Sequence, residues 1–142
     1  MCPKDSWIII KKALPQHTDH AGVVWHGSYL NWLEEARIDA LSKVGLDYQV
    51  ITNKGFELPV INVSIKYLAP ILIGQEVIIK SQFQINDIGP KVNIKSELIS
   101  YDEKIFTKAD LNLVLINKES FKIIKKRPDF LKYPFKKLNK GP

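Results

Sequence analysis

The spacing of apolar residues divides the chain into one long helix and several strands. From Tyr29 to Val44 apolar side chains recur mostly at steps of three and four residues, the period of an α-helix about 15 residues long. Ser28 can supply the N-cap oxygen, and Gly45 lies just past the last periodic residue, where glycine often ends a helix. Apolar residues cover a wide arc of this helix, so we expect it to be largely buried.

Five segments have the composition of β-strands. The first is Trp7-Ile8-Ile9-Ile10, a short apolar run within Ser6–Ala13. Four later segments of about ten residues each are rich in Val and Ile and partly alternate: Glu57–Tyr67, Glu76–Asn86, Lys91–Tyr101 and Ile105–Asn117. Short breaks join the last three, which predicts a meander. Leu46–Lys54, which precedes these four segments, fits either a loop or a short second helix.

These elements predict an α+β fold in which one antiparallel sheet of about five strands wraps around a single long central helix. The helix covers one face of such a sheet, so the other face and the edge strands need a further partner. We therefore expect a homo-oligomer, either a homodimer or a homotetramer.

The composition is that of one globular domain. Of the 142 residues, 45% are hydrophobic and 25% are charged, as in ordinary soluble proteins. No apolar run is long enough to cross a bilayer, and the first residues lack the pattern of a secretion signal. We expect a cytoplasmic protein with no membrane partner. The single cysteine, Cys2, excludes an intramolecular disulfide and a thiolate metal cluster.

The net charge of +6 comes from the C-terminal end of the chain. Residues 118–142 hold 9 Lys and Arg against 2 Asp and Glu, whereas residues 1–117 are almost neutral. We therefore divide the chain into a globular domain, residues 1–117, and a basic C-terminal tail, residues 118–142. Aromatic residues interleave with the cations of this tail, a pattern found both in nucleic-acid-binding arms and in tails that dock on the body. We favour a docked or solvated tail and do not expect nucleic acid as a partner.

The segment Thr18–Tyr29, just ahead of the long helix, holds the strongest candidates for chemistry. Asp19 is a lone carboxylate in a turn with little side-chain bulk around it, and it can act as a general base or as a nucleophile. The equally weighted alternative is that Asp19 simply caps its own turn. The backbone N–H of His26 lies near the helix start, where unsatisfied donors suit an oxyanion.

Other residues of this region carry weaker signals. Trp25, Tyr29 and Trp32 could line an acyl or aryl pocket, although aromatics at helical spacing more often form plain core. His17, His20 and His26 follow steps of three and six residues, which match no common metal-ligand spacing, and no Cys or Glu completes a set. We expect neither a metal nor a cofactor.

The pattern from Asp19 to Arg37 resembles the 4-hydroxybenzoyl-CoA thioesterase family of hotdog-fold proteins. The family signature is roughly D-x-x-G-[IV]-[VI]-[YW]-[HY]-x-x-Y followed by a helix, and Asp19 to Tyr29 fill it without gaps. The predicted strand order from Ser6 to Asn117 agrees with a hotdog, and the basic tail lies outside it. The resemblance implies hydrolysis of an acyl-CoA or aryl-CoA thioester, such as 1,4-dihydroxy-2-naphthoyl-CoA or 4-hydroxybenzoyl-CoA. A thioester of an acyl carrier protein is a close variant.

The resemblance also implies a role for each residue of the site. Asp19 matches the catalytic aspartate, and the backbone N–H of His26 matches the donor to the thioester carbonyl. Gly22 would admit the thioester to the helix end, and Lys91 is the one cation that matches the family's contacts with the CoA phosphates. Substrate-binding roles also fall to Trp25 and Tyr29.

Another class of function stays open beside this one. A hotdog protein without catalytic activity could bind an acyl-CoA and use its basic tail to bind a nucleic acid or a partner.

Overall fold

The computed structural model describes residues 5–142, so Cys2 lies outside the described residues. The elements in chain order are β1 (Trp7–Lys12), the 3-10 turn η1 (Pro15–His17), α1 (His26–Lys43), α2 (Tyr48–Asn53), β2 (Phe56–Glu57), β3 (Val60–Tyr67), β4 (Glu76–Gln84), β5 (Lys91–Ile99), β6 (Ile105–Val114), β7 (Ile116–Asn117), the 3-10 turn η2 (Asp129–Leu131) and α3 (Lys132–Lys140).

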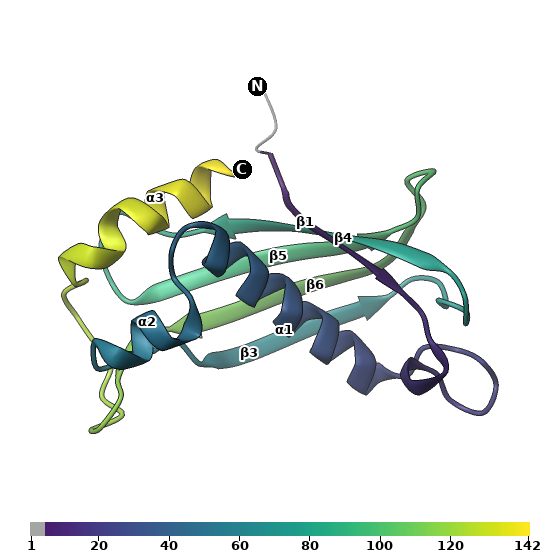
Figure 1. The fold of residues 1–142 in the computed structure, drawn as a ribbon, viewed down its shortest axis with the longest axis horizontal. Coiled ribbons are helices and arrows are strands. Elements are labelled where there is room, and N and C mark those ends of the chain that lie inside the picture. The colour runs from purple at the N-terminus through teal and green to yellow at the C-terminus, as the bar shows by residue number, and fades with distance from the viewer. Residues whose placement is uncertain (1–4) are drawn as a thin grey trace.

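Five strands form one antiparallel sheet in the order β1-β4-β5-β6-β3, and α1 lies across one face of it (Figure 1). The predicted α+β fold and the meander of β4, β5 and β6 are confirmed. Two of the expected strands are divided, because the short strands β2 and β7 leave the main sheet and pair with each other. The ambiguous segment after the long helix contains the short helix α2.

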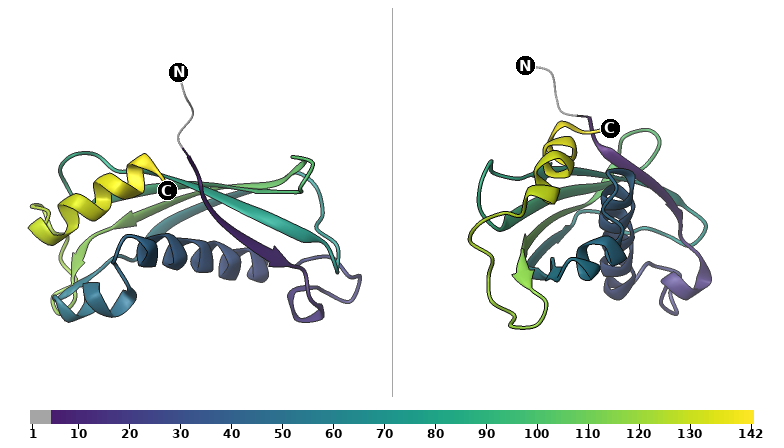
Figure 2. Two further views of the ribbon diagram at one scale, coloured as in Figure 1. Left: turned by 45° about the horizontal axis from the view of Figure 1, so that its top comes forward. Right: turned by 60° about the vertical axis from the view of Figure 1, so that its left-hand side comes forward.

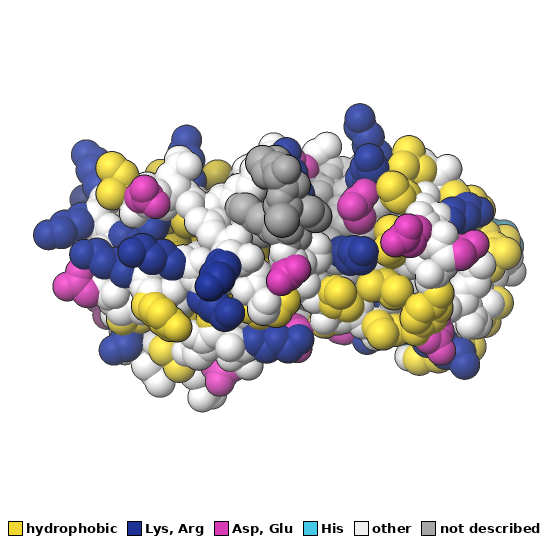
Figure 3. Space-filling model, turned by 90° about the horizontal axis from the view of Figure 1, so that it is seen from above, with side chains coloured by type: hydrophobic (Ala, Val, Ile, Leu, Met, Phe, Trp, Pro, Cys, Tyr) yellow, Lys and Arg dark blue, Asp and Glu magenta, His cyan; other side chains and the backbone are white. Residues whose placement is uncertain are grey.

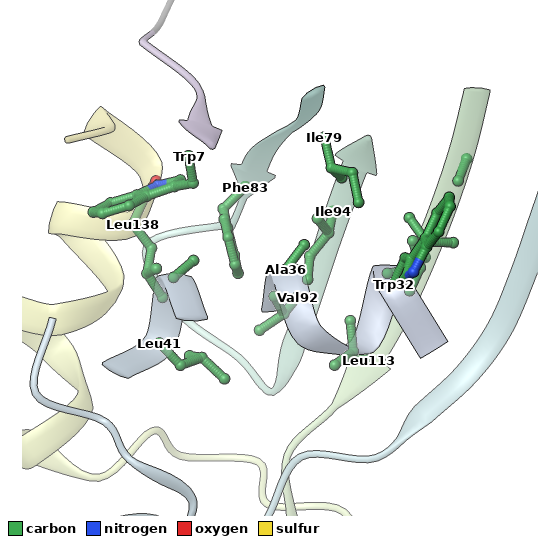
Figure 4. Close-up of a cluster of buried hydrophobic side chains, with 14 of the residues drawn as sticks. Trp7, Trp32, Ala36, Leu41, Ile79, Phe83, Val92, Ile94, Leu113 and Leu138 are labelled. Carbon is green, nitrogen blue, oxygen red and sulfur yellow. The ribbon is translucent and has the colours of Figure 1, made fainter. Parts of the chain in front are cut away.

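The core fills the space between α1 and the sheet (Figure 4). Trp32 of α1 is fully buried, and small residues of the same helix, Ala36 and Ala40, let the backbone approach the strands closely. Val77 and Ile79 alternate along β4 with more exposed residues, so their side chains lie on the face that α1 covers. Trp32 is thus a core residue, the commoner of the two interpretations that its spacing allowed.

The middle of the opposite face of the sheet is polar, whereas Ile8 and Ile10 of β1 are 44% and 54% exposed at its edge. Lys80 of β4 is paired in register with Glu97 of β5, and Glu97 is paired with Lys108 of β6. Lys108 in turn lies opposite Lys66 of β3. This face forms a hollow of about 540 Å³ lined mostly by charged and hydroxyl side chains. Water solvates such side chains well, so the polar part of this face does not by itself require the partner that the sequence argument assigned to the face.

The edge strand β3 does expose apolar surface. Ile61 is 60% exposed and Val63 is 40% exposed, and β3 has no neighbouring strand on its outer side within residues 5–142. An unpaired edge with apolar side chains favours association with another chain.

Residues 118–142 end in a docked helix. Leu131, Phe135 and Leu138 are buried, and α3 lies beside the start of β1 (Figure 2). The indole Nε1 of Trp7 donates a hydrogen bond to the carbonyl of Leu138 at 3.0 Å. Apart from Arg127, the cations of this segment are not buried, and Figure 3 shows Lys and Arg side chains gathered at the end of the molecule that carries α3.

The helix in this segment was not predicted, because its prolines were interpreted as breaks in regular structure. Pro134 lies in the first turn of α3, where a proline is tolerated because its missing N–H has no intrahelical acceptor there.

Arg127 ties this segment to the loop between β4 and β5. Its side chain is 8% exposed, and its guanidinium donates to the backbone carbonyls of Asn86, Asp87 and Gly89 at 2.7 to 3.0 Å. The guanidinium carbon also lies 5.0 Å from the ring centroid of Phe135. Burial lowers the pKa of Arg127, which still carries its charge at neutral pH.

None of the helices in residues 5–142 is both long enough and apolar enough to span a membrane. The same residues contain no group of three or more His, Cys, Asp or Glu side chains placed to share a metal ion.

Candidate active site

The segment Thr18–Val24 folds as a small hairpin. Thr18 pairs with Val24, and the Asp19 N–H donates to the Val23 carbonyl at 2.9 Å. The Gly22 N–H donates to the Asp19 carbonyl at 3.0 Å and closes the turn. Gly22 has a φ of +75°, a backbone conformation that glycine adopts without a steric penalty. The sequence Asp-His-Ala-Gly therefore fixes a tight turn that presents Asp19.

The segment before β4 holds this hairpin in place. The Val24 N–H donates to the carbonyl of Ile71 at 2.8 Å, and the Ile73 N–H donates to the carbonyl of Gly22 at 2.9 Å. Ile71 is fully buried, so this attachment reaches into the core. These two hydrogen bonds therefore attach the hairpin to the segment before β4 and, through Ile71, to the core.

The carboxylate of Asp19 is fixed by backbone donors. Its Oδ1 accepts hydrogen bonds from the N–H groups of Ala21 at 2.8 Å and Val23 at 3.2 Å. These bonds, the one from Val23 first, lower the pKa of Asp19 below its ordinary value of 3.8. Asp19 does cap its own turn, but both bonds end on Oδ1, which leaves Oδ2 for a substrate or a water molecule.

Helix α1 begins three residues earlier than predicted. Trp25 is its N-cap residue with an extended backbone, and His26 is the first helical residue. Ser28 is therefore not the N-cap; its hydroxyl donates instead to the carbonyl of His17 at 3.0 Å. The His26 N–H has no acceptor among residues 5–142, as expected for the first turn of a helix, and the positive end of the helix dipole adds to its field.

His17 connects the turn η1 to this helix start. Its carbonyl accepts hydrogen bonds from the Trp25 N–H at 3.2 Å and from the Ser28 hydroxyl. Its ring Nδ1 accepts from the Leu14 N–H at 3.0 Å, and the ring lies edge-on to Trp32 with 5.2 Å between centroids. Sequence reasoning missed this role for His17, because its partners Trp25, Ser28 and Trp32 come from a later part of the chain.

An open depression of about 510 Å³ brings the site residues together. Its lining contains four of the six residues assigned from the sequence, Asp19, Trp25, His26 and Tyr29, together with Val23, Val24, Tyr67, Leu68, Ala69 and Pro70. The hairpin thus contributes Asp19, and the start of α1 contributes His26, to the lining of one cavity.

Tyr29 and Tyr67 form the aromatic part of this lining. Tyr29 is 3% exposed, and its ring meets that of Tyr67 edge-on at 5.0 Å. Burial raises the pKa of Tyr29, which keeps its phenol neutral. Tyr67 ends β3 and is half exposed. Sequence reasoning did not select Tyr67, although it lies directly before the Leu68-Ala69-Pro70 break.

Two of the assigned residues lie outside the lining. Gly22 serves the turn of the hairpin. Lys91 begins β5, seven residues before Leu98, and Leu98 shares a register row with Thr107 and Tyr67 at the depression. At about 3.3 Å per residue, Lys91 lies roughly 23 Å along the strand from that row. Within one chain, the structure does not bring Lys91 to the site.

Residues 13–115 match the family model of the thioesterase-like superfamily. The chain belongs to the thioesterase-like superfamily. This match includes the hairpin of Asp19, all of α1 and the sheet from β3 to β6, and it ends before the docked C-terminal segment.

Individual relatives in the thioesterase-like superfamily share part of this range. The protein sll0410 of Synechocystis sp., named as a candidate esterase, is 42% identical over 81 residues, which cover 56% of this chain and 49% of that protein. The chain thus matches about half the length of that relative. A 1,4-dihydroxy-2-naphthoyl-CoA hydrolase of Acaryochloris marina is 30% identical over 104 residues, 72% of this chain and 76% of the relative.

Among solved structures of this fold, Slr0204, a 1,4-dihydroxy-2-naphthoyl-CoA thioesterase from Synechocystis, superposes with a TM-score of 0.84 at 22% identity. The alignment covers 94% of this chain and 98% of that structure. At this identity the likeness shows a shared hotdog fold, as the sequence predicted.

Proposed function

We propose that this protein hydrolyses an acyl-CoA or aryl-CoA thioester to the free acid and CoA. The observation that carries the proposal is that Asp19, with its carboxylate, and His26, with its free N–H at the start of α1, line the same depression. Thioester hydrolysis needs a base or nucleophile beside the carbonyl carbon and a donor at the carbonyl oxygen, and these two groups supply them. The relatives' names support the same class of reaction.

Two routes use these groups. As a general base, Asp19 takes a proton from water while the water oxygen attacks the carbonyl carbon and the electron pair moves to the carbonyl oxygen, which the His26 N–H stabilises. Collapse of this intermediate breaks the C–S bond, and the CoA thiolate takes the proton from Asp19. As a nucleophile, Asp19 forms a mixed anhydride, expels the thiolate and is released when water hydrolyses the anhydride.

For the acyl group we propose an aromatic one, as in 1,4-dihydroxy-2-naphthoyl-CoA or 4-hydroxybenzoyl-CoA. Trp25, Tyr29 and Tyr67 surround the depression, and flat aromatic rings are favourable partners for a flat acyl group. The name of the Acaryochloris marina relative favours the naphthoyl compound. Membership in the 4-hydroxybenzoyl-CoA thioesterase branch of the superfamily is part of the same proposal, as is a cytoplasmic location.

The working unit that we propose is a dimer formed through β3. This strand ends at Tyr67 in the depression, so a second copy paired along β3 would lie next to the site. Lys91 is too far from Asp19 within one chain, and we assign its contact with the CoA phosphates to the thioester bound by the other copy.

A panel of thioesters tests the activity. Acetyl-CoA, 4-hydroxybenzoyl-CoA and 1,4-dihydroxy-2-naphthoyl-CoA would be incubated with the protein and a thiol reagent that reports free CoA. We expect hydrolysis of the aromatic thioesters and a loss of about a hundredfold or more in Asp19→Asn. Asp39→Asn is the matched control, because Asp39 lies on α1 outside the depression, paired with Lys43 at 2.8 Å.

Each outcome of this panel is informative. Equal rates for the unaltered protein and Asp19→Asn would remove Asp19 from the mechanism. An absence of hydrolysis for every thioester, with binding of the same compounds retained, would favour the non-catalytic acyl-CoA-binding protein instead.

A further inference from the structure

The indole of Trp25 rests directly on the backbone of Gly27. A Cβ atom built on Gly27 would overlap three carbons of the indole, Cη2, Cζ3 and Cζ2. Gly27 is the second residue of α1, in ordinary helical conformation, so the backbone there does not itself require glycine. What requires glycine is the position of the ring.

The backbone of Trp25 is fixed independently of its side chain. Its N–H donates to the carbonyl of His17 at 3.2 Å, and its carbonyl accepts from the Ser28 N–H at 3.0 Å. The indole itself is 45% exposed, and its neighbouring ring is His26, edge-on at 5.2 Å. The ring therefore has room to turn about its side-chain bonds, and the missing Cβ at position 27 creates the place where it lies.

This indole forms part of the wall of the depression beside Asp19 and His26. The indole lies where a Cβ atom of residue 27 would be, so a ring displaced from Gly27 must move into the depression or out into solvent. Either movement changes the shape of the wall that a substrate's acyl group meets.

We propose that Gly27 is a specificity-determining residue: by leaving space for the Trp25 indole on the helix, it shapes the site for a flat aromatic acyl group. This inference rests on the proposed thioesterase function and extends it to a residue that does not line the depression. Gly27 acts through Trp25 and is a positioning residue.

Substitution by alanine separates this role from a role in folding. Alanine is a better helix former than glycine, and the group that a new Cβ meets is the far end of a mobile side chain. Gly27→Ala should therefore leave thermal stability unchanged or slightly higher. Asn31→Ala is the matched control, since Asn31 is an exposed residue of the same helix outside the depression.

A double-mutant cycle tests the proposal. We would measure kcat/KM for 4-hydroxybenzoyl-CoA and acetyl-CoA in the unaltered protein, Gly27→Ala, Trp25→Ala and the double variant. We expect Gly27→Ala and Trp25→Ala each to lower the ratio of aromatic to acetyl activity about tenfold. In the Trp25→Ala background the Gly27 substitution should have no further effect, because the ring that it displaces is gone.

A fluorescence measurement gives a second readout that needs no activity. Trp7 and Trp32 are buried, so the difference in acrylamide quenching between a protein and its Trp25→Ala variant reports Trp25. We expect this difference to change in Gly27→Ala, rising if the ring moves into solvent and falling if it moves into the depression, and to stay unchanged in Asn31→Ala.

The two proposals fail in different ways. If no thioester is hydrolysed but quenching of Trp25 changes in Gly27→Ala, the thioesterase proposal fails and the contact between the indole and Gly27 stands without a role in specificity. An unchanged aromatic-to-acetyl ratio in Gly27→Ala, an effect of equal size in the Trp25→Ala background, or unchanged quenching would overturn the role of Gly27.

Discussion

Asp19 and Val23 are hydrogen-bonded twice, once through the backbone and once through the carboxylate. The Asp19 N–H donates to the Val23 carbonyl at 2.9 Å, and the Val23 N–H donates back to Oδ1 of Asp19 at 3.2 Å. The carboxylate is therefore held by the turn that it caps, without a basic side chain among its hydrogen-bond partners. Capping and catalysis, which were alternatives for Asp19 on the sequence, are compatible in the structure.

The pH dependence of activity follows from these backbone donors. They stabilise the ionised carboxylate and lower the pKa of Asp19 below 3.8, so the active form is lost only as the pH falls through that lowered pKa. We expect the acid limb of kcat/KM that belongs to Asp19 to lie below pH 3.8. A pH–rate profile on a thioester stable in acid checks this. A limb near pH 5 or above whose position shifts in Asp19→Glu would show that Asp19 titrates there and would contradict it.

Asparagine and alanine substitutions of Asp19 should separate the two roles of the carboxylate. The asparagine side chain retains an Oδ1 acceptor for the N–H groups of Ala21 and Val23, whereas the alanine side chain has none. We expect Asp19→Asn to lose activity with little change in Tm, and Asp19→Ala to lose both activity and thermal stability. Thermal unfolding followed by circular dichroism measures the difference. A lower Tm for Asp19→Asn than for Asp19→Ala would contradict this interpretation of the turn.

We expect the His17 ring to support activity mainly through Nδ1, which accepts the hydrogen bond from the Leu14 N–H. Asparagine places an oxygen close to the position of Nδ1, so His17→Asn can still accept from the Leu14 N–H, whereas His17→Leu cannot. We expect His17→Leu to lower kcat about tenfold with a smaller change in KM, and His17→Asn to recover most of the loss. Steady-state kinetics on one aromatic thioester provide the comparison. Equal defects in both variants would show that ring packing on Trp32 is the larger contribution.

Arg127 should anchor the C-terminal segment. Replacement by methionine leaves three backbone carbonyls of the β4–β5 loop without their donor, and we expect it to lower the free energy of unfolding by about 1–3 kcal/mol. Lys126→Met is the control, since it removes a neighbouring exposed cation. Urea denaturation measures both. Similar small losses in the two variants would mean that the guanidinium contributes charge rather than hydrogen bonds.

We expect two copies of the protein to associate through the exposed edge of β3. We expect Ile61→Lys to shift the protein toward monomer and to lower thioesterase activity, because it places a charge on a surface that the second copy covers. Ile88→Lys alters a residue that is 83% exposed in the β4–β5 loop and serves as control. Sedimentation velocity reports the oligomeric state. If the unaltered protein is a monomer with full activity, the proposed dimer is wrong, and so is the role that we assigned to Lys91 in it.

Local patterns were sufficient for most of the fold. The strands of the meander and the long helix follow from residue periodicity, and Gly45 ends α1 with a φ of +83°, as a glycine at that position can. The start of α1 was misplaced because Ser28 is a good N-cap residue by its chemistry. Its hydroxyl instead donates a hydrogen bond to the carbonyl of His17, 11 residues away, and the helix begins three residues before the predicted start.

Contacts distant in sequence account for what the patterns missed. The helix α3 contains a proline and many lysines, so its local signal is weak. It is held by buried contacts of Leu131, Phe135 and Leu138 and by a hydrogen bond from Trp7, 131 residues away. Tyr67 was missed for the same reason: its contact with Tyr29 joins residues distant in sequence and depends on how β3 and α1 pack.

Periodicity and turn chemistry were enough to define the α+β fold and the turn that carries Asp19, and they placed the start of the long helix to within three residues. Which groups share the depression, how far Lys91 lies along its strand, and the room that Gly27 makes for Trp25 emerged only in three dimensions. These relationships depend on the distances between elements, which the packing of α1 against the sheet sets and which no local pattern contains.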